Sequence, residues 1–198
     1  MFEIMTVCTG NICRSPLAEQ LIRTRLADLP GKVTSAGTYG LDNTEMTPEA
    51  QRLAAHYGVA ADLSAAHRSR PLSSALLAEP DLILAMAREH RRNIVEIAPA
   101  RLRSTFTLRE FARLASDTDD HEIVAAIDAQ ADVSTRLRSA VAAVAAHRGV
   151  SLPPATPEDD DVIDPYRRSW QTYELSGQQL VPAIDQVVRV VRLAAERS

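Results

Sequence analysis

Cysteine is scarce in this chain of 198 residues: there are two, Cys8 and Cys13, and both lie in one short segment. Two cysteines this close together cannot form the disulfide framework that marks small secreted proteins. The N-terminus also carries Glu3 and lacks the basic residues and long apolar stretch of a secretory signal. We therefore expect a protein of the reducing cytoplasm.

Long apolar runs and an excess of positive charge are also missing. No apolar run approaches the roughly 20 residues that cross a bilayer, so no membrane span is expected. The formal net charge is -4, whereas a general nucleic-acid binder needs a basic surface. The five histidines show no zinc-like pairing, so neither a metal nor a cofactor is expected; they are His56, His67, His90, His121 and His147.

Strand and helix patterns alternate along the chain, which predicts an α/β fold with a parallel sheet covered by helices on both faces. The four expected strands cover about 2–8, 32–37, 81–86 and 103–106. The expected helices cover about 14–28, 48–58 and 87–97, one from 108 onwards, two in 121–148 and a last one carrying Ile184, Val187, Val188 and Val191. Thr47 and Thr107 are expected helix caps, and Asp119–Glu122 reads as the acidic start of a helix. We expect one domain of this three-layer kind.

The segment from Val7 to Glu19, V-C-T-G-N-I-C-R-S-P-L-A-E, carries the chemistry. It follows an apolar strand and leads into a helix, and the five residues between Cys8 and Arg14 suffice for a tight loop. Backbone N–H groups of such a loop, at the start of a helix, can converge on one phosphate. Only the thiolate form of cysteine is a good nucleophile, and a helix N-terminus and a nearby guanidinium both favour it. The pattern indicates cleavage of phosphate esters by a thiolate.

Each neighbour of Cys8 in this loop has a chemical reason to be there. Arg14 can bind two phosphate oxygens through its planar fork, and the Ser15 hydroxyl is placed to hydrogen-bond the thiolate. Gly10 gives backbone freedom, and Asn11 tolerates left-handed dihedrals and could tie the loop to adjacent strands. For Cys13, a reversible disulfide with Cys8 and a plain packing role both stay open.

This segment resembles the signature V-C-x-G-N-I-C-R-S-P-x-A-E of the low-molecular-weight protein tyrosine phosphatase family. Ser35-Ala36-Gly37-Thr38 resembles the turn after the family's second strand, Asp81–Met86 its buried third strand, and Asp164-Pro165-Tyr166 its general-acid loop. The resemblance covers about 1–111 and 162–196. Residues 115–160 are longer than the family usually carries there, so we expect a helical insertion at that place within a single domain, 1–198.

The resemblance implies roles for particular residues. Asp164 would protonate the leaving group and then activate water, and Tyr166 would form an aromatic wall. The loop from Thr9 to Cys13 would hold the phosphate. Ile12 favours phosphotyrosine, because relatives that resemble arginine phosphatases place Thr there. Where the family commonly has an aromatic residue on the opposite wall, this chain offers Leu41 or Tyr39.

Several charged groups are expected to be structural. The acidic run 158–161 is expected to be a solvated loop, and Arg88, Arg91 and Arg92 a solvated helix face. Arg68 and Arg70 are expected to make structural pairs.

The predicted function is hydrolysis of phosphotyrosine in proteins, and of small aryl phosphates, through a phosphocysteine. The expected partners are phosphotyrosine proteins and phosphate or similar oxyanions, and the insertion could dock a partner or a second subunit in a homodimer. Three alternatives stay open: a thiol-dependent arsenate reductase, a phosphoarginine phosphatase and a non-catalytic phosphate-binding module. No cysteine after Cys13 is present for the usual arsenate relay.

Overall fold

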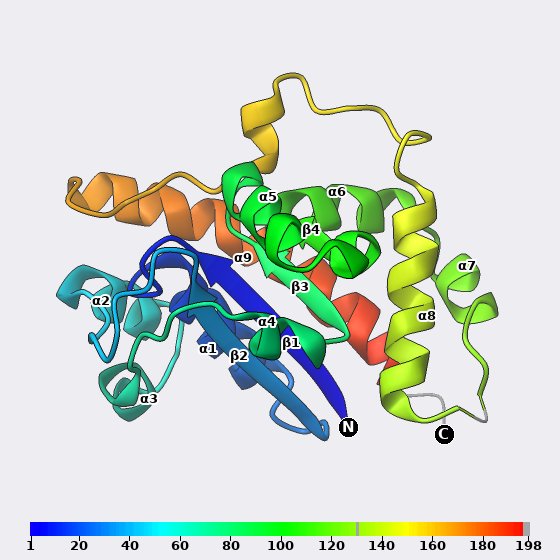
Figure 1. The fold of residues 1–198 in the computed structure, drawn as a ribbon, viewed down its shortest axis with the longest axis horizontal. Helices are drawn as coiled ribbons and strands as arrows, with labels where there is room; N and C mark the ends of the chain where they lie inside the picture. Colours follow the sequence, from blue (N-terminus) through cyan, green and yellow to red (C-terminus); the bar gives the residue numbers. More distant parts are fainter. Residues whose placement is uncertain (130, 196–198) are drawn as a thin grey trace.

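A four-stranded parallel sheet forms the centre of the computed structural model (Figure 1), which describes residues 1–129 and 131–195. The strands are β1 (Phe2–Cys8), β2 (Gly31–Gly37), β3 (Leu82–Ala85) and β4 (Thr105–Thr107), in the order β2-β1-β3-β4 with every pair parallel. Gln130, within the predicted insertion, and residues 196–198, at the end of the predicted domain, lie outside the described residues.

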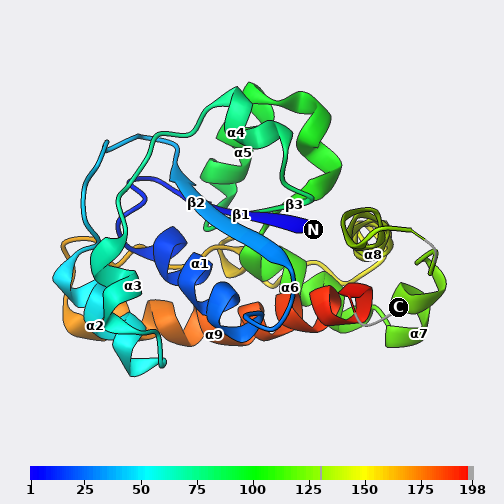
Figure 2. The ribbon, with the colours of Figure 1, turned by 90° about the horizontal axis from the view of Figure 1, so that it is seen from below.

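Helices cover both faces of this sheet (Figure 2). Alternate residues of each strand point to opposite faces, so Ile4 belongs to the larger apolar cluster and Met5 to the smaller. The larger cluster holds α1 (Arg14–Arg25), α6 (Leu108–Asp117) and α9 (Trp170–Ala195), and the smaller holds α4 (Ser74–Ala78) and α5 (Arg88–Ile97). The predicted α/β sandwich is confirmed.

The predicted helix caps are present. The Thr47 hydroxyl accepts from the N–H of Ala50 at 3.2 Å and starts α2 (Pro48–His56). Thr107 and Glu110 form a reciprocal capping box at the start of α6, with bonds of 3.1 and 3.0 Å. Gly58, with φ of 82°, lies just past the end of α2.

Some boundaries were predicted wrongly. The fourth strand begins at Thr105 rather than Arg103, because residues Pro99–Ser104 form a 3-10 helix, η1. The hydroxyl groups of Ser104 and Thr105 both donate to the Arg101 carbonyl and close this turn. The short helices α3 (Ala61–Ala66) and α4 are additional elements that the sequence pattern does not reveal.

Residues 115–160 join the main core instead of forming an appendage. They contain α7 (Asp120–Ala125), capped by Asp119, then α8 (Val133–Ala146) and the 3-10 turn η2 (Pro157–Asp160). Leu137 and Val144 of α8 are fully buried in the larger cluster. Asp81, before β3, accepts from Ser134 of α8 at 2.7 Å and from the N–H of Glu3 at 2.9 Å. That this region is an insertion relative to the family stays a prediction.

The acidic run is solvated as predicted, with Glu158 71% exposed, but it forms a 3-10 turn and also makes ion pairs. Glu158 and Asp161 form ion pairs with Arg88 at 2.7 and 3.1 Å, and Asp160 pairs with Arg113 at 2.8 Å. These contacts attach η2 to α5 and α6, and they bring the chain back toward the carboxyl end of the sheet. Arg88 is thus a structural partner rather than part of a solvated face.

No helix among the described residues is both long enough and apolar enough to cross a bilayer.

Candidate active site

A pocket of about 290 Å³ opens at the carboxyl ends of the central strands. β1 connects to β2 on one side, and β3 lies on the other, so the strand order reverses there; open α/β sheets bind ligands at such a point. The lining residues are Cys8, Thr9, Gly10, Ile12, Cys13, Arg14, Tyr39, Leu41, Asp164 and Tyr166. All were predicted site residues, and the remaining two, Asn11 and Ser15, lie fully buried beneath the loop.

Cys8 ends β1 and lies at the bottom of this pocket. Its Sγ is 3.0 Å from the Ser15 Oγ. The Asn11 side-chain amide donates to the same Ser15 oxygen at 2.9 Å. Because that oxygen already accepts from Asn11, the Ser15 hydroxyl hydrogen is left to point at the sulfur. Ser15 is therefore arranged to donate to a thiolate.

Asn11 holds the loop to its surroundings. Its backbone is left-handed, with φ of 56°, as its residue type allows. Its amide also donates to the Ser35 Oγ at 2.7 Å, and its Oδ1 accepts from the N–H of Arg70 at 3.1 Å. The His67 Nε2 lies 2.8 Å from the Asn11 carbonyl. The left-handed conformation that the residue type of Asn11 allows is thus present, whereas Gly10 does not have a positive φ.

The backbone N–H groups of the loop are free to bind an anion. From Thr9 to Cys13, none of them donates a hydrogen bond to any group in the described residues. The Ile12 carbonyl, by contrast, is taken by the N–H of Thr47 at 3.0 Å. α1 begins directly afterwards at Arg14, and its Cys13 cap makes no side-chain bond to the first turn. The loop and the helix start together form a cradle of unsatisfied donors.

Arg14 connects the loop to the distant segment that carries Asp164. Its guanidinium is almost fully buried, forms an ion pair with the Asp164 carboxylate at 2.9 Å and donates to the Val162 carbonyl at 3.1 Å. The Arg14 Nε is buried with no partner among the described residues. A buried donor of this kind is costly unless an acceptor satisfies it, and an oxyanion in the pocket would do so.

The walls of the pocket are more exposed than its floor. Tyr39 is 79% exposed, Leu41 42% and Tyr166 41%, whereas Ile12 is 7% exposed. The backbone N–H of Tyr166 donates to the Asp164 Oδ1 at 3.1 Å, and both residues line the pocket. Both predicted candidates for the opposite wall, Tyr39 and Leu41, line the pocket.

Cys13 differs from Cys8 in its surroundings. Its thiol lies near the hydroxyl groups of Thr47, at 3.5 Å, and Tyr173, at 3.7 Å. Burial raises the pKa of Cys13 to about 11, more than these hydroxyl groups can offset. Both cysteines are free thiols in the structure.

His90 is a buried neighbour of the loop that the sequence analysis did not single out. Its Nε2 lies 2.8 Å from the Thr9 hydroxyl, and its Nδ1 has no partner among the described residues. Burial, and then the positive charge of Arg14, lower the pKa of His90 to about 3. It is therefore a neutral imidazole at physiological pH. A lone histidine in a charged helix gives no sequence signal for this position.

The remaining predicted groups have structural partners. The Arg70 Nε donates to the Ser35 carbonyl at 2.8 Å, and Arg68 pairs with Glu45 at 2.9 Å, as expected. Arg91 lies 3.6 Å from Glu110, and Arg92 2.9 Å from Glu96. In the part of the chain that the structure describes, no group of three or more His, Cys, Asp or Glu side chains is arranged to hold a metal ion.

Comparison with known proteins agrees with this geometry. The profile of the "Low molecular weight phosphotyrosine protein phosphatase" family matches residues 3–144. The chain is 45% identical over 98 residues to the low molecular weight protein-tyrosine-phosphatase Etp of Escherichia coli K12, an alignment that spans 49% of this chain and 62% of Etp. It is 37% identical over 111 residues to a protein-arginine-phosphatase of Geobacillus stearothermophilus, spanning 56% of this chain and 71% of that protein.

A solved structure shows the same arrangement of elements. The tyrosine phosphatase Wzb from Escherichia coli K30, in complex with sulphate, superposes with a TM-score of 0.64 at 26% identity, covering 96% of this chain and 98% of Wzb. The profile match spans more than half of the chain, and the structural alignment with Wzb covers nearly all of both chains. This chain therefore belongs to the low molecular weight phosphotyrosine protein phosphatase family.

Proposed function

We propose that this protein hydrolyses phosphotyrosine in proteins, and small aryl phosphates, through a phosphocysteine intermediate. The observation that carries the proposal is the position of the Cys8 sulfur. It lies 3.0 Å from the Ser15 hydroxyl, in a pocket that Arg14 and Asp164 also line. The chain spans less than two thirds of the length of Etp, so the activity is inferred from the site.

The proposed first step transfers the phosphoryl group to sulfur. The Cys8 thiolate attacks phosphorus while the bond to the tyrosine oxygen breaks. The loop N–H groups and Arg14 stabilise the phosphoryl oxygens. Because Arg14 exchanges its ion pair with Asp164 for the phosphoryl oxygens, Asp164 can carry a proton. As the general acid it gives this proton to the departing tyrosine oxygen, which typically contributes 10²–10⁴ in rate.

The second step regenerates the enzyme. The Asp164 carboxylate takes a proton from water as the water oxygen attacks phosphorus, and the bond to sulfur breaks. The Ser15 hydroxyl donates to the thiolate as it leaves, which its hydrogen-bond partners prepare it to do. Inorganic phosphate is released, and the thiolate is ready again. A thiol nucleophile must stay reduced, which supports the cytoplasm as the site of action.

The test measures hydrolysis of p-nitrophenyl phosphate and of phosphotyrosine peptides without added metal. We expect Cys8→Ser to abolish turnover and Asp164→Ala to lower kcat by 10²–10⁴. Asp42→Ala is the control, because Asp42 is exposed next to the pocket residue Leu41 and does not itself line the pocket; it should keep near-normal kcat. Turnover that survives Cys8→Ser would rule out the phosphocysteine route, and binding without turnover in the wild type would favour a phosphate-binding module.

Phosphoarginine is the second candidate substrate, since relatives named protein-arginine-phosphatase are 37% and 36% identical. Ile12 argues for phosphotyrosine, because this apolar side chain lines the pocket and offers no polar group to a guanidine. We expect a preference for phosphotyrosine over phosphoarginine, reduced by Ile12→Thr. The opposite preference in the wild type would replace the substrate class while leaving the mechanism on Cys8 intact.

A further inference from the structure

The outer edge of β2 has no partner strand over part of its length, although Val33 and Ser35 in that part are 7% and 2% exposed. β2 is the last strand in the sheet order and pairs only with β1. The N–H of Thr38, just after β2, donates to the Cys8 carbonyl of β1, so alternate residues of β2, including Val33 and Ser35, direct their backbone groups outward. Within the described residues, the N–H groups of Val33 and Ser35 and the Val33 carbonyl have no hydrogen-bond partner.

The same edge is already paired at its far end. The Gly37 N–H donates to the Arg70 carbonyl at 2.9 Å, and the Gly37 carbonyl accepts from Leu72 at 2.8 Å. This contact is a parallel bridge between Gly37 and Pro71. One short segment of the chain thus adds to the sheet as an extra strand would, and the groups that precede it along β2 stay free.

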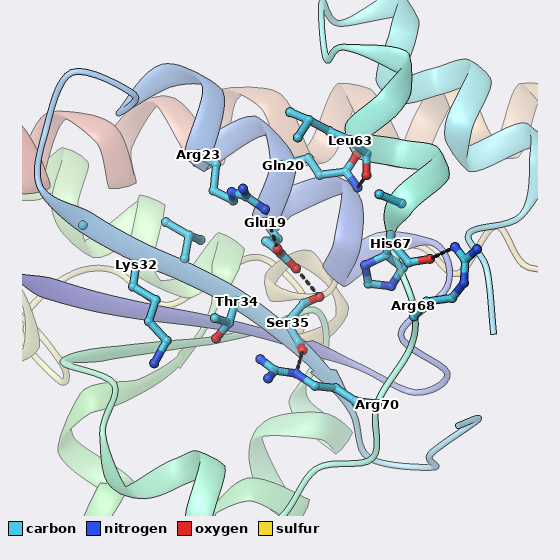
Figure 3. Close-up of a pocket in the computed structure, with 13 residues that line it drawn as sticks. Glu19, Gln20, Arg23, Lys32, Thr34, Ser35, Leu63, His67, Arg68 and Arg70 are labelled. Atoms are coloured by element: carbon cyan, nitrogen blue, oxygen red, sulfur yellow. Dashed lines mark hydrogen bonds and ion pairs between the residues drawn. The ribbon is translucent and has the colours of Figure 1, made fainter. Parts of the chain in front are cut away.

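A groove of about 630 Å³ runs along the free part of the edge, between β2, α1, α3 and the segment after α3. In Figure 3, Lys32 and Arg70 lie on one side of β2, and Glu19, Arg23 and Leu63 lie on the other. The apolar lining consists of Val33, Leu63 and Ala66.

The groove is positively charged although the chain as a whole is acidic. Lys32 is the only lysine in the sequence; it is 54% exposed and makes one ion pair, with Glu3. Arg23 is 48% exposed, and Arg70 uses only its Nε, leaving its other two guanidinium nitrogens without a partner in the described residues. Glu19, the one acid in the lining, is engaged by Ser35 at 2.6 Å and by Arg23 at 3.3 Å.

We infer that the free edge of β2 binds an extended acidic segment of the phosphoprotein substrate as an additional strand. Main-chain bonds to Val33 would fix the segment, joined by bonds to Ser35 once Arg70 leaves the Ser35 carbonyl for an acidic side chain of the segment. Alternate side chains of the segment would point to opposite faces. Acidic residues would face Lys32 and Arg70, and small apolar residues would face Leu63 and Ala66. The motif recognised is therefore an alternation of acidic and apolar residues.

Charge opposes a second copy of the chain as the occupant. Pairing of two β2 edges would bring the lysine and arginines of both copies together, and a lysine on an edge strand opposes such pairing. The substrate is favoured because β2, which lines the groove, ends two residues before Tyr39 at the pocket wall. Ser35 and Tyr39 are four residues apart, so their Cα atoms are separated by at most about 14 Å. The inference rests on the proposed function for the identity of the bound protein.

The binding test uses a fluorescein-labelled hexapeptide that alternates glutamate and valine, followed by fluorescence anisotropy. We expect Lys32→Glu to weaken its binding at least tenfold and Lys32→Gln to weaken it less. Arg103→Glu, the same charge change at an exposed arginine far from the groove, should leave binding unchanged. Two versions of the hexapeptide, one N-methylated at the odd-numbered amides and one at the even-numbered amides, should differ in affinity at least tenfold, because only one of these sets faces β2. Equal binding of the hexapeptide to the wild type and to Lys32→Glu, or equal binding of the two N-methylated versions, would overturn the inference.

A kinetic test separates this inference from the proposed function. Lys32→Glu should hydrolyse p-nitrophenyl phosphate like the wild type. In the wild type, KM should be at least fivefold lower for phosphotyrosine peptides that carry the acidic segment than for peptides with glutamine in place of its glutamates. Lys32→Glu should lose this difference in KM. Failure of the wild type on p-nitrophenyl phosphate would refute the proposed function and leave the hexapeptide measurement valid. A dimer in sedimentation that the hexapeptide dissociates would instead show a second copy on the edge.

Discussion

The floor of the pocket is buried and held by hydrogen bonds, whereas its walls are exposed side chains on loops. Asn11 and Ser15 under the loop are fully buried, and they bond to each other and to Cys8 and Ser35. Tyr39 and Tyr166 are 79% and 41% exposed, and no hydrogen bond of either phenol group is found within the described residues. The floor therefore fixes where the sulfur and phosphate lie, and the walls are free to vary with the substrate.

The difference follows from what each part must do. Transition-state stabilisation requires donors held in place before the reaction, so the groups that hold the phosphate are supported by a second set of buried contacts. A wall that only packs against an aromatic ring needs area rather than precise placement. Mutations in the floor should therefore change kcat or stability, and mutations in the walls should mainly change KM.

Among the variants that compare the floor with the walls, Arg14→Lys is expected to have the largest effect. Lysine keeps the charge but cannot reach Val162, Asp164 and a phosphate with one planar group. We expect kcat for p-nitrophenyl phosphate to fall by about 10²–10³, the range typical of losing one transition-state donor. Arg109→Lys is the control, because Arg109 donates to the nearby Asp161 carbonyl at 2.9 Å and does not line the pocket. A decrease of less than tenfold for Arg14→Lys would contradict its assigned position.

Asn11→Ala tests the support beneath the floor. It removes three side-chain hydrogen bonds, worth about 0.5–1.5 kcal/mol each, and puts alanine at φ of 56°, which costs about 1–2 kcal/mol more. We expect the free energy of unfolding in urea to fall by about 2.5–6.5 kcal/mol, with a lower kcat because Ser15 loses its donor.

The chain offers a matched control for this variant. Asn43 is also left-handed, with φ of 52°, but it is exposed. The free energy of unfolding of Asn43→Ala should therefore fall only by the cost of the left-handed backbone, about 1–2 kcal/mol, and kcat should be unchanged. Equal losses for the two variants would mean that the network around Asn11 contributes nothing to stability.

The sequence predicts the floor better than it predicts the walls, for a physical reason. The loop residues are contiguous, and each has a chemical constraint that its type reveals, so Cys8, Arg14 and Asn11 could be identified in advance. The residues of the walls, and those that support the loop, are distant in the sequence and come together only in the folded structure. His90 lies 81 positions from its partner Thr9, and the arginine partners of the acidic turn lie on other helices. Short elements such as α3 and η1 depend on local turn contacts that periodicity does not encode.

Tyr166→Ala tests the walls and should have a smaller effect. Loss of one aromatic contact is worth about 0.5–1.5 kcal/mol, so KM for aryl phosphates should rise by about two- to tenfold with little change in kcat. Leu41→Trp should lower the same KM by adding area on the other side. An alkyl phosphate serves as the control substrate, and its KM should respond to neither change. A large fall in kcat for Tyr166→Ala would show that the wall also positions Asp164.

The smallest effect is expected for Cys13→Ser, and it decides between the two interpretations of Cys13. With its pKa raised to about 11 by burial, the Cys13 thiol is ionised in about one molecule in 10⁴ at pH 7. Only the thiolate attacks an oxidised partner, so capture of oxidised Cys8 by Cys13 should be slow at neutral pH and should accelerate as the pH rises toward 11. We therefore expect near-normal kcat for Cys13→Ser. In the wild type at pH 7, mass spectrometry should find iodoacetamide labelling on Cys8 alone. Peroxide inactivation, and recovery of activity with an added thiol, should proceed at the same rates in Cys13→Ser and in the wild type. Slower rescue or irreversible oxidation in Cys13→Ser alone would show that Cys13 protects Cys8 through a disulfide despite its burial.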